Sequence, residues 1–137
     1  MKSALNAYLS FKDNARDAMQ FYQSVFGGKL VMNTFKEFHA TENPAEEDLI
    51  MHAMLEAENG ITFMGSDTPS YMPYESGARI SLALNGDNAE QLKGYFEKLS
   101  EGGTVTMPLG KAPWGAYYGA LTDKFGINWM VNIAEQA

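Results

Sequence analysis

The chain contains an internal repeat, and this repeat constrains the fold more than any other feature of the sequence. Asp13-Asn14-Ala15 recurs unchanged as Asp87-Asn88-Ala89, and Gly27-Gly28 recurs as Gly102-Gly103. Between these landmarks lie two matching aromatic pairs, Phe21-Tyr22 and Tyr95-Phe96. Each of these features alone is common at the ends of helices. Their agreement in order and spacing, however, indicates a duplicated supersecondary unit.

Both copies predict the same order of elements, which is a strand, a helix and three strands. An Asx residue begins each predicted helix, apolar residues recur within it at three- and four-residue spacing, and a glycine pair ends it. Asn59-Gly60 predicts a hairpin in the first copy, because both residues tolerate positive φ. The predicted strands are 5–11, 29–38, 49–58 and 61–64 in the first copy, and 78–84, 104–107, 116–122 and 127–133 in the second.

This pattern predicts an α+β fold with two βαβββ modules. A single such unit leaves one sheet face uncovered, whereas two units together form a curved mixed sheet, or cup, with the helices packed outside. We expect one domain over residues 1–137, with module one at about 1–70 and module two at about 78–137. The concave side of such a cup is a natural site for a small molecule.

Composition and charge exclude several classes of function. The absence of cysteine among the 137 residues rules out disulfides, zinc–thiolate sites and a cysteine nucleophile. A net charge of −7 disfavours nucleic acid as a partner, because an acidic surface repels phosphates. We find no signal peptide and no apolar run long enough to span a membrane, so we expect no membrane association and a cytoplasmic location.

Several motifs carry a resemblance to a known family. They are YLSFKDNARDAMQFY at 8–22, VFGG at 25–28, WG at 114–115, YG at 118–119 and DKFGINWMVN at 123–132. These motifs resemble PhnB-like proteins of the vicinal oxygen chelate (glyoxalase/bleomycin resistance/dioxygenase) superfamily, and the likeness runs nearly end to end. The resemblance implies a homodimer and the cup-shaped fold. PhnB-like sequences often carry a demethylubiquinone methyltransferase label, but this chain lacks the glycine-rich strand-to-helix turn typical of a nucleotide-like cofactor site.

The resemblance also implies where a metal would be bound. Metal-dependent members place His and Glu ligands on the first and last strands of each half. The matching positions here are Ala7 or Tyr8, Ile80 or Ser81, Met64 and Met130. Thioethers are poor ligands for Fe, Mn, Ni or Zn, so we expect no metal and no cofactor, with a divalent metal kept as the alternative.

His52 is the best candidate for a catalytic residue, as a general base or as a hydrogen-bonding partner of a substrate. Glu56 shares its face of the strand by period two, and the competing interpretation is a structural histidine. We expect His39 to be exposed, and Asp67 and Asp123 to serve in turns. The predicted ligand-binding residues, which could equally be core, are Tyr8, Phe63, Met64, Trp114, Tyr118, Trp129 and Met130.

The sequence leaves open whether the protein is an enzyme. The favoured hypothesis is that it binds a small molecule in a metal-free apolar cup. The alternative is a metal-dependent isomerase, lyase, dioxygenase or resistance transferase of the same superfamily. A third possibility is a dimer whose cup is filled by its own side chains. Loops 40–48 and 65–77 are predicted to be either lids or dimer contacts.

Overall fold

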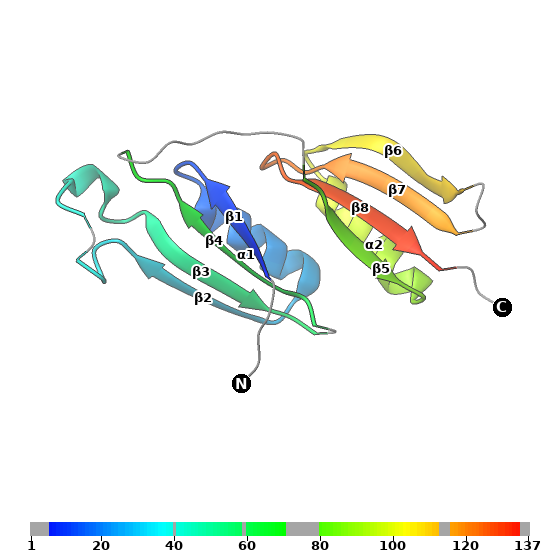
Figure 1. The fold of residues 1–137 in the computed structure, drawn as a ribbon, viewed down its shortest axis with the longest axis horizontal. Helices are drawn as coiled ribbons and strands as arrows, with labels where there is room; N and C mark the ends of the chain where they lie inside the picture. Colours follow the sequence, from blue (N-terminus) through cyan, green and yellow to red (C-terminus); the bar gives the residue numbers. More distant parts are fainter. Residues whose placement is uncertain (1–5, 40, 59, 71–79, 113–115, 135–137) are drawn as a thin grey trace. The chain divides into compact units, whose positions relative to one another are not determined.

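The computed structural model of the chain describes residues 6–39, 41–58, 60–70, 80–112 and 116–134. The chain divides into two compact units, Met1–Glu75 and Ser76–Ala137, which we call module one and module two. Each module has the order strand, helix and three strands, so the predicted pair of βαβββ modules is confirmed (Figure 1). Among the described residues, no helix is long and apolar enough to cross a membrane.

Module one is a four-stranded mixed sheet with one long helix. Its strands lie in the order β1-β4-β3-β2, with β1 and β4 parallel and the other neighbours antiparallel. Helix α1 packs on one face of this sheet. The elements are β1 (Ala7–Phe11), α1 (Ala15–Phe26), β2 (Lys29–Thr34), the short 3-10 helix η1 (Pro44–Glu46), β3 (Ile50–Glu56) and β4 (Thr62–Asp67).

Module two repeats this topology. Its strands lie in the order β5-β8-β7-β6, with β5 parallel to β8 and the other neighbours antiparallel, and helix α2 packs on one face. The elements are β5 (Leu82–Gly86), α2 (Ala89–Ser100), β6 (Thr104–Lys111), β7 (Tyr117–Thr122) and β8 (Asn128–Ile133). The pairing of the first strand with the last is therefore the same in both modules.

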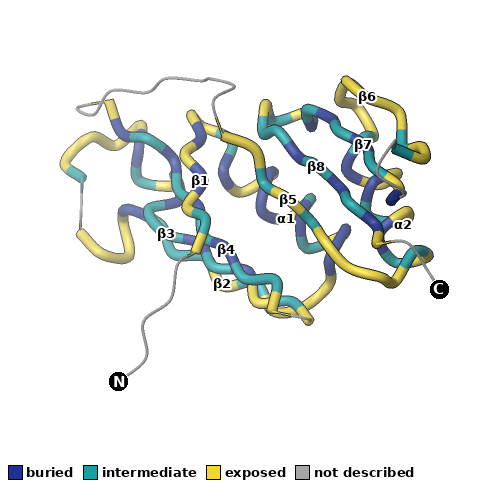
Figure 2. The backbone as a smooth tube through the Cα atoms, turned by 45° about the vertical axis from the view of Figure 1, so that its right-hand side comes forward, coloured by how far each residue is buried: buried dark blue, intermediate teal, exposed yellow. Residues whose placement is uncertain are grey.

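The core of each module lies between its helix and its sheet, where the buried segments gather in Figure 2. Side chains alternate across a strand, so every second residue points at the helix. In module one the ring of Phe63 packs edge-on against Tyr22 and Phe26, with centroids 5.4 Å and 6.0 Å away. In module two the buried residues include Leu92, Phe96, Leu99, Leu121, Trp129, Val131 and Ile133. We call the opposite side of each sheet, turned away from its own helix, the open face.

The glycine pairs that end the helices have a steric cause. Gly28 has φ +90, and a Cβ at this position would collide with the backbone carbonyl of Glu56. Gly103 stands at the matching position, where a Cβ would collide with the carbonyl of Thr122. The second glycine of each pair is thus required because the chain passes directly against the end of β3 in module one and of β7 in module two.

Several predicted boundaries were wrong, for local reasons. Strand β2 ends at Thr34 instead of 38, because the side chain of Glu37 folds back onto Thr34 and closes a turn. Strand β4 continues to Asp67, so Gly65, predicted to begin a loop, is paired with Leu9 and Ala53. Strand β5 begins at Leu82 rather than 78, and β6 runs on to Lys111 rather than ending at 107. The part of loop 65–77 beyond Ser70 lies outside the described residues.

Candidate functional site

The open face of module one carries a continuous apolar row across all four strands. Tyr8 is paired with Met64, Met64 with Met54, and Met54 with Val31. All four belong to the alternate positions that point away from α1, and they form what we call the apolar stripe. Tyr8 and Val31 at its ends are 49% and 45% exposed, and both methionines are partly exposed. The stripe is therefore accessible apolar surface rather than core.

A polar row runs beside this stripe on the same face. Ser10 is paired with Ser66, and His52 is paired with Asn33. The imidazole of His52 lies 6.3 Å from the ring of Tyr8, centroid to centroid, at a tilt of 49°. His52 is half-buried and belongs to the open face, so its ring does not serve as packing beneath the helix. Glu56 lies further along the same face, as the period-two argument predicted, opposite Lys29.

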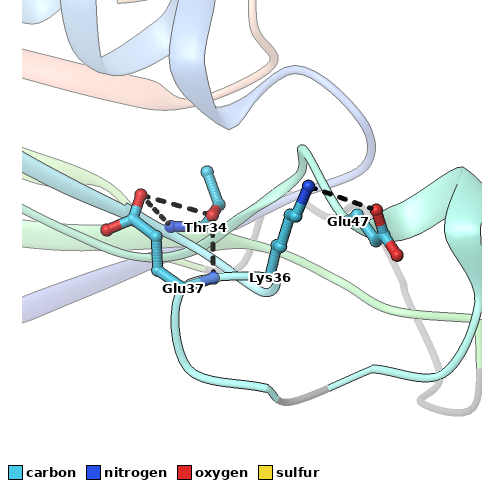
Figure 3. A network of polar contacts seen from close by, with 4 residues as sticks. All are labelled: Thr34, Lys36, Glu37 and Glu47. Carbon is cyan, nitrogen blue, oxygen red and sulfur yellow. Dashed lines mark hydrogen bonds and ion pairs between the residues drawn. The ribbon is translucent and has the colours of Figure 1, made fainter.

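The polar row ends at β2 in a small hydrogen-bonded network. The amide Nδ2 of Asn33 donates to Oε2 of Glu37 at 3.2 Å, while the backbone N and the hydroxyl of Thr34 both donate to Oε1 at 3.3 Å. These bonds, above all the one from Asn33, lower the pKa of the Glu37 carboxyl below its ordinary value, so it is ionised at neutral pH. Figure 3 shows the Thr34–Glu37 contacts and an exposed ion pair, 4.0 Å long, from Lys36 of the same turn to Glu47, which follows η1.

The open face of module two has equivalent rows with different side chains. Its middle row pairs Ala83 with Met130, Met130 with Ala120 and Ala120 with Met107, so alanines alternate with methionines, and Met107 at the end of the row is 50% exposed. The neighbouring polar row consists of Asn85, Asn132 and Tyr118 in register. The hydroxyl of Tyr118 donates to the sulfur of Met130 at 3.1 Å. By strand and register, Tyr118 occupies in module two the position that His52 occupies in module one.

Four of the predicted ligand-binding residues lie on the open faces of the two modules. Tyr8 and Met64 lie on the open face of module one, and Tyr118 and Met130 lie on that of module two. Trp114 falls outside the described residues.

Phe63 and Trp129 lie elsewhere, and the prediction that they line a cup needs correction. They precede Met64 and Met130 by one residue, so strand alternation turns them toward the helices. There they are 4% and 3% exposed. The indole Nε1 of Trp129 also donates to Oδ2 of Asp123 at 2.9 Å, which fixes the ring inside module two.

The register also corrects the positions at which a family metal would be expected. In module one the first and last strands bring together Tyr8 and Met64. In module two the matching pair is Ala83 and Met130, because β5 begins later than predicted and neither residue 80 nor residue 81 belongs to it. Alanine offers no donor atom, and a thioether is a poor ligand for divalent first-row metals, so these positions do not suit such an ion. Within the described parts of the chain, no three His, Asp or Glu side chains converge.

Three buried carboxylates serve structure. Asp67, predicted to act in a turn, instead accepts hydrogen bonds from the backbone N of Ala15 at 2.9 Å and of Ile50 at 2.8 Å, and so joins the start of α1 to the start of β3. Asp123 is a turn acid as predicted, accepting from the backbone N atoms of 125 and 127. Glu46 accepts from the backbone N of Ser70 at 2.8 Å and from its hydroxyl at 3.2 Å, which ties η1 to the segment after β4.

Sequence reasoning missed Asn33 and Glu37. Alternation along the predicted strand 29–38 assigns Asn33 to one face, but it does not reveal that His52 is its partner, because that requires the register. Glu37 was hidden because it was predicted to continue the strand, whereas it belongs to the turn after β2.

Comparison with known proteins agrees with this architecture. Residues 4–131 match the family model described as Glyoxalase/Bleomycin resistance protein/Dioxygenase superfamily. Protein YjdN of Escherichia coli (strain K12) is 29% identical over 143 residues, which cover 96% of each chain. The chain belongs to the glyoxalase/bleomycin resistance protein/dioxygenase superfamily.

Two solved structures narrow the relationship. The crystal structure of protein PA1353 from Pseudomonas aeruginosa has a TM-score of 0.82 and 37% identity, covering 98% of this chain and 100% of that one. A PhnB protein from Bacillus cereus, described as a putative 3-demethylubiquinone-9 3-methyltransferase, has a TM-score of 0.77 and 30% identity, covering 96% and 100%. Within the superfamily, this chain is a PhnB-like member.

Proposed function

We propose that the protein binds a small, largely apolar molecule on the open face of module one without a divalent metal. The observation that carries this proposal is the apolar stripe, which crosses all four strands of module one and is not covered by α1. A contiguous apolar surface of this kind marks a binding site more often than a chance exposure. Its two central methionines adapt to ligands of different shape, because their side chains are flexible and polarizable.

A metal-dependent isomerase, lyase, dioxygenase or resistance transferase is the competing class, and its support is the superfamily to which the chain belongs. The donor chemistry at Tyr8, Met64, Ala83 and Met130 speaks against it. The methyltransferase description of the Bacillus cereus relative is not extended to this chain, since the connection from β1 to α1 is Lys12-Asp13-Asn14 and contains no glycine.

We also propose a homodimer in the cytoplasm. Strands β1 and β2 are the outer strands of the module one sheet, and β5 and β6 are those of module two. Unprotected sheet edges favour pairing with another chain, and a symmetric dimer is the commonest outcome. Sedimentation equilibrium tests this proposal, with a mass of twice 15.1 kDa expected and a strictly monomeric protein contradicting it.

The experiment that tests small-molecule binding is a fluorescence titration with the neutral apolar dye N-phenyl-1-naphthylamine, using EDTA-treated protein without an affinity tag. We expect saturable binding to the wild-type protein. Met64→Lys should weaken it about tenfold or more, because the change removes apolar contact and places a charge in the stripe.

The matched control is Val105→Lys. Val105 is an apolar residue of β6, 42% exposed, whose strand partner Leu121 belongs to the helix side of the sheet. Its variant should bind the dye like the wild type. Absence of dye binding, or equal binding by Met64→Lys and the wild type, would contradict the proposal.

A further inference from the structure

The ligand-facing surface of module one joins an apolar row to a row of hydrogen-bonding groups. His52 is the residue of the polar row whose ring nitrogens can exchange the roles of donor and acceptor, since an imidazole has two tautomers. It adjoins the stripe directly, 6.3 Å from the ring of Tyr8. A molecule that covers the stripe would therefore bring any polar substituent next to His52.

The orientation of the neighbouring amide is fixed by the network at the end of β2. Oε1 of Glu37 accepts from the backbone N of Thr34, a group that can only donate, and Oε2 accepts from Nδ2 of Asn33. The Asn33 side chain cannot turn over without placing its oxygen against a carboxylate. Its Oδ1 is consequently the atom left to face other partners.

His52 lies directly opposite Asn33 on the adjoining strand. Cβ atoms of such pairs are about 4.5–5.5 Å apart, a distance over which an amide oxygen and an imidazole N–H can meet after a small change of rotamer. An acceptor at this position favours the tautomer whose N–H points at it, and the second ring nitrogen then has no proton. That nitrogen is then able to accept a hydrogen bond.

We infer that the ligand carries a hydroxyl or similar hydrogen-bond donor beside its apolar body, and that His52 accepts this bond as a specificity-determining residue. Asn33 and Glu37 are positioning residues, which act by setting the tautomer of His52. This inference rests on the proposed small-molecule function and names the chemical class of the ligand.

The charges on the same face agree with a neutral donor. Glu37 is ionised at one end of the polar row, and Glu56 carries a second carboxylate on this face beside Lys29. Two carboxylates disfavour an anionic ligand, such as a carboxylate or a phosphate, by simple repulsion. An alcohol or a phenol meets no such barrier.

Two probes with the same ring system test the inference, 2-naphthol and 2-methoxynaphthalene, each titrated against bound N-phenyl-1-naphthylamine. Only the first can donate a hydrogen bond. We expect 2-naphthol to bind the wild-type protein about three- to tenfold more tightly, the range of one net hydrogen bond. His52→Phe keeps a ring at the site but no acceptor, so the two probes should bind it equally.

The variant that tests the positioning role most directly is Glu37→Gln, because glutamine is nearly isosteric with glutamate. Its amide oxygen must stay with the backbone N of Thr34, so its amide nitrogen faces Asn33 and turns that side chain over. His52 then meets a donor, takes the opposite tautomer and presents an N–H to the ligand. The preference for 2-naphthol should disappear or reverse, although the overall fold and melting temperature stay close to those of the wild type.

The tautomer of His52 can be read directly from the ring ¹⁵N chemical shifts, which a purely structural role of Glu37 would leave unchanged. The chain has two histidines, so the spectrum holds one internal reference, the exposed His39. Glu37→Gln should exchange the two ring-nitrogen shifts of His52 and leave those of His39 in place. His39→Asn, a residue type that tolerates the positive φ at this position, should retain the preference for 2-naphthol.

The outcomes separate this inference from the proposal beneath it. Equal binding of both probes by the wild-type protein would overturn the inference and leave small-molecule binding intact. A retained preference and an unchanged His52 tautomer in Glu37→Gln would overturn the positioning role. No binding of dye or probes would refute the proposed function and this inference together.

Discussion

The two modules share a backbone plan and differ on their open faces. Tyr8 pairs with Met64 in module one as Ala83 pairs with Met130 in module two, so the strand register is the same. The glycines that end the helices also match, since Gly28 lies against the end of β3 and Gly103 lies against the end of β7. On the open face, however, the middle row of module one consists only of bulky apolar residues and has a histidine beside it, whereas the middle row of module two alternates alanine with methionine and has a tyrosine beside it. Packing between helix and sheet thus constrains the two modules to the same backbone geometry, whereas the side chains of the open faces are free to differ.

The modules also begin their helices differently. In module two the side chain of Asn88, the residue just before α2, accepts from the backbone N of Gln91 at 3.0 Å and so caps the helix locally. In module one Asn14 makes no side-chain cap, and Asp67 supplies the acceptor for α1 from the end of β4. A local cap in one module is therefore replaced by a long-range one in the other.

This difference gives the largest expected effect on stability. Asp67→Ala removes the partner of two backbone N–H groups, those of Ala15 and Ile50, and should lower the free energy of unfolding by about 3–5 kcal/mol. Asn88→Ala should cost only about 1 kcal/mol, as for an ordinary cap. Urea denaturation measures both values. Equal costs for the two variants would show that Asp67 is no more than a cap.

The glycine pairs test whether both modules need glycine at the matched position for the same steric reason. Gly28→Ala and Gly103→Ala should each lower the free energy of unfolding by about 2–4 kcal/mol, because the added Cβ collides with backbone in both modules. Gly27→Ala is the control, since its φ of 72 is unfavourable for alanine but nothing lies within 4 Å of the added Cβ. It should cost about 1 kcal/mol. A mild effect at only one of the two matched positions would break the equivalence.

The open faces can be compared through one pair of equivalent methionines. Met64→Ala should weaken dye binding by about tenfold, since Met64 is flanked by the large side chains of Tyr8 and Met54 in a continuous stripe. Met130→Ala should have a smaller effect, because the neighbours of Met130 are Ala83 and Ala120. The dye titration decides between them, and a larger loss for Met130→Ala would assign the main apolar contact to module two.

The smallest effect concerns the acidic turn of module one, for which module two has no described counterpart. The pKa of Glu37 is lowered below 4.5 in the folded protein, chiefly by Asn33, so its hydrogen bonds add stability at pH values above about 4.5. This contribution is lost as the pH falls through the lowered pKa. The melting temperature of Glu37→Ala should therefore lie slightly below that of the wild type at pH 7 and approach it in acid. A gap that widens toward low pH would contradict this account.

Much of the fold was predictable because its causes are local. Alternating and helical periodicity, together with the repeated Asx and glycine residues, predicted the long helix and the four strands of each module, with errors at strand ends, but not the short helix η1, which lies in the predicted loop 40–48. The cap of α1 was mispredicted, since Asn14 is a good capping residue by type and only the tertiary structure brings Asp67 to that place.

The candidate site was predictable only in part, because it depends on strand facing. His52, Tyr8 and Met64 were found by residue type and lie together on one face. Phe63 and Trp129 were chosen by the same reasoning and lie in the cores, since a shift of one residue along a strand reverses the face.

The measurement that tests the central claim most directly is dye affinity before and after removal of metal. Untagged protein would be assayed for bound metals by mass spectrometry and titrated with N-phenyl-1-naphthylamine, then treated with EDTA and titrated again. The account predicts less than stoichiometric Fe, Mn, Ni and Zn and the same dye affinity in both titrations. A stoichiometric metal whose removal abolishes binding, and whose return restores it, would contradict the account and favour the metal-dependent class.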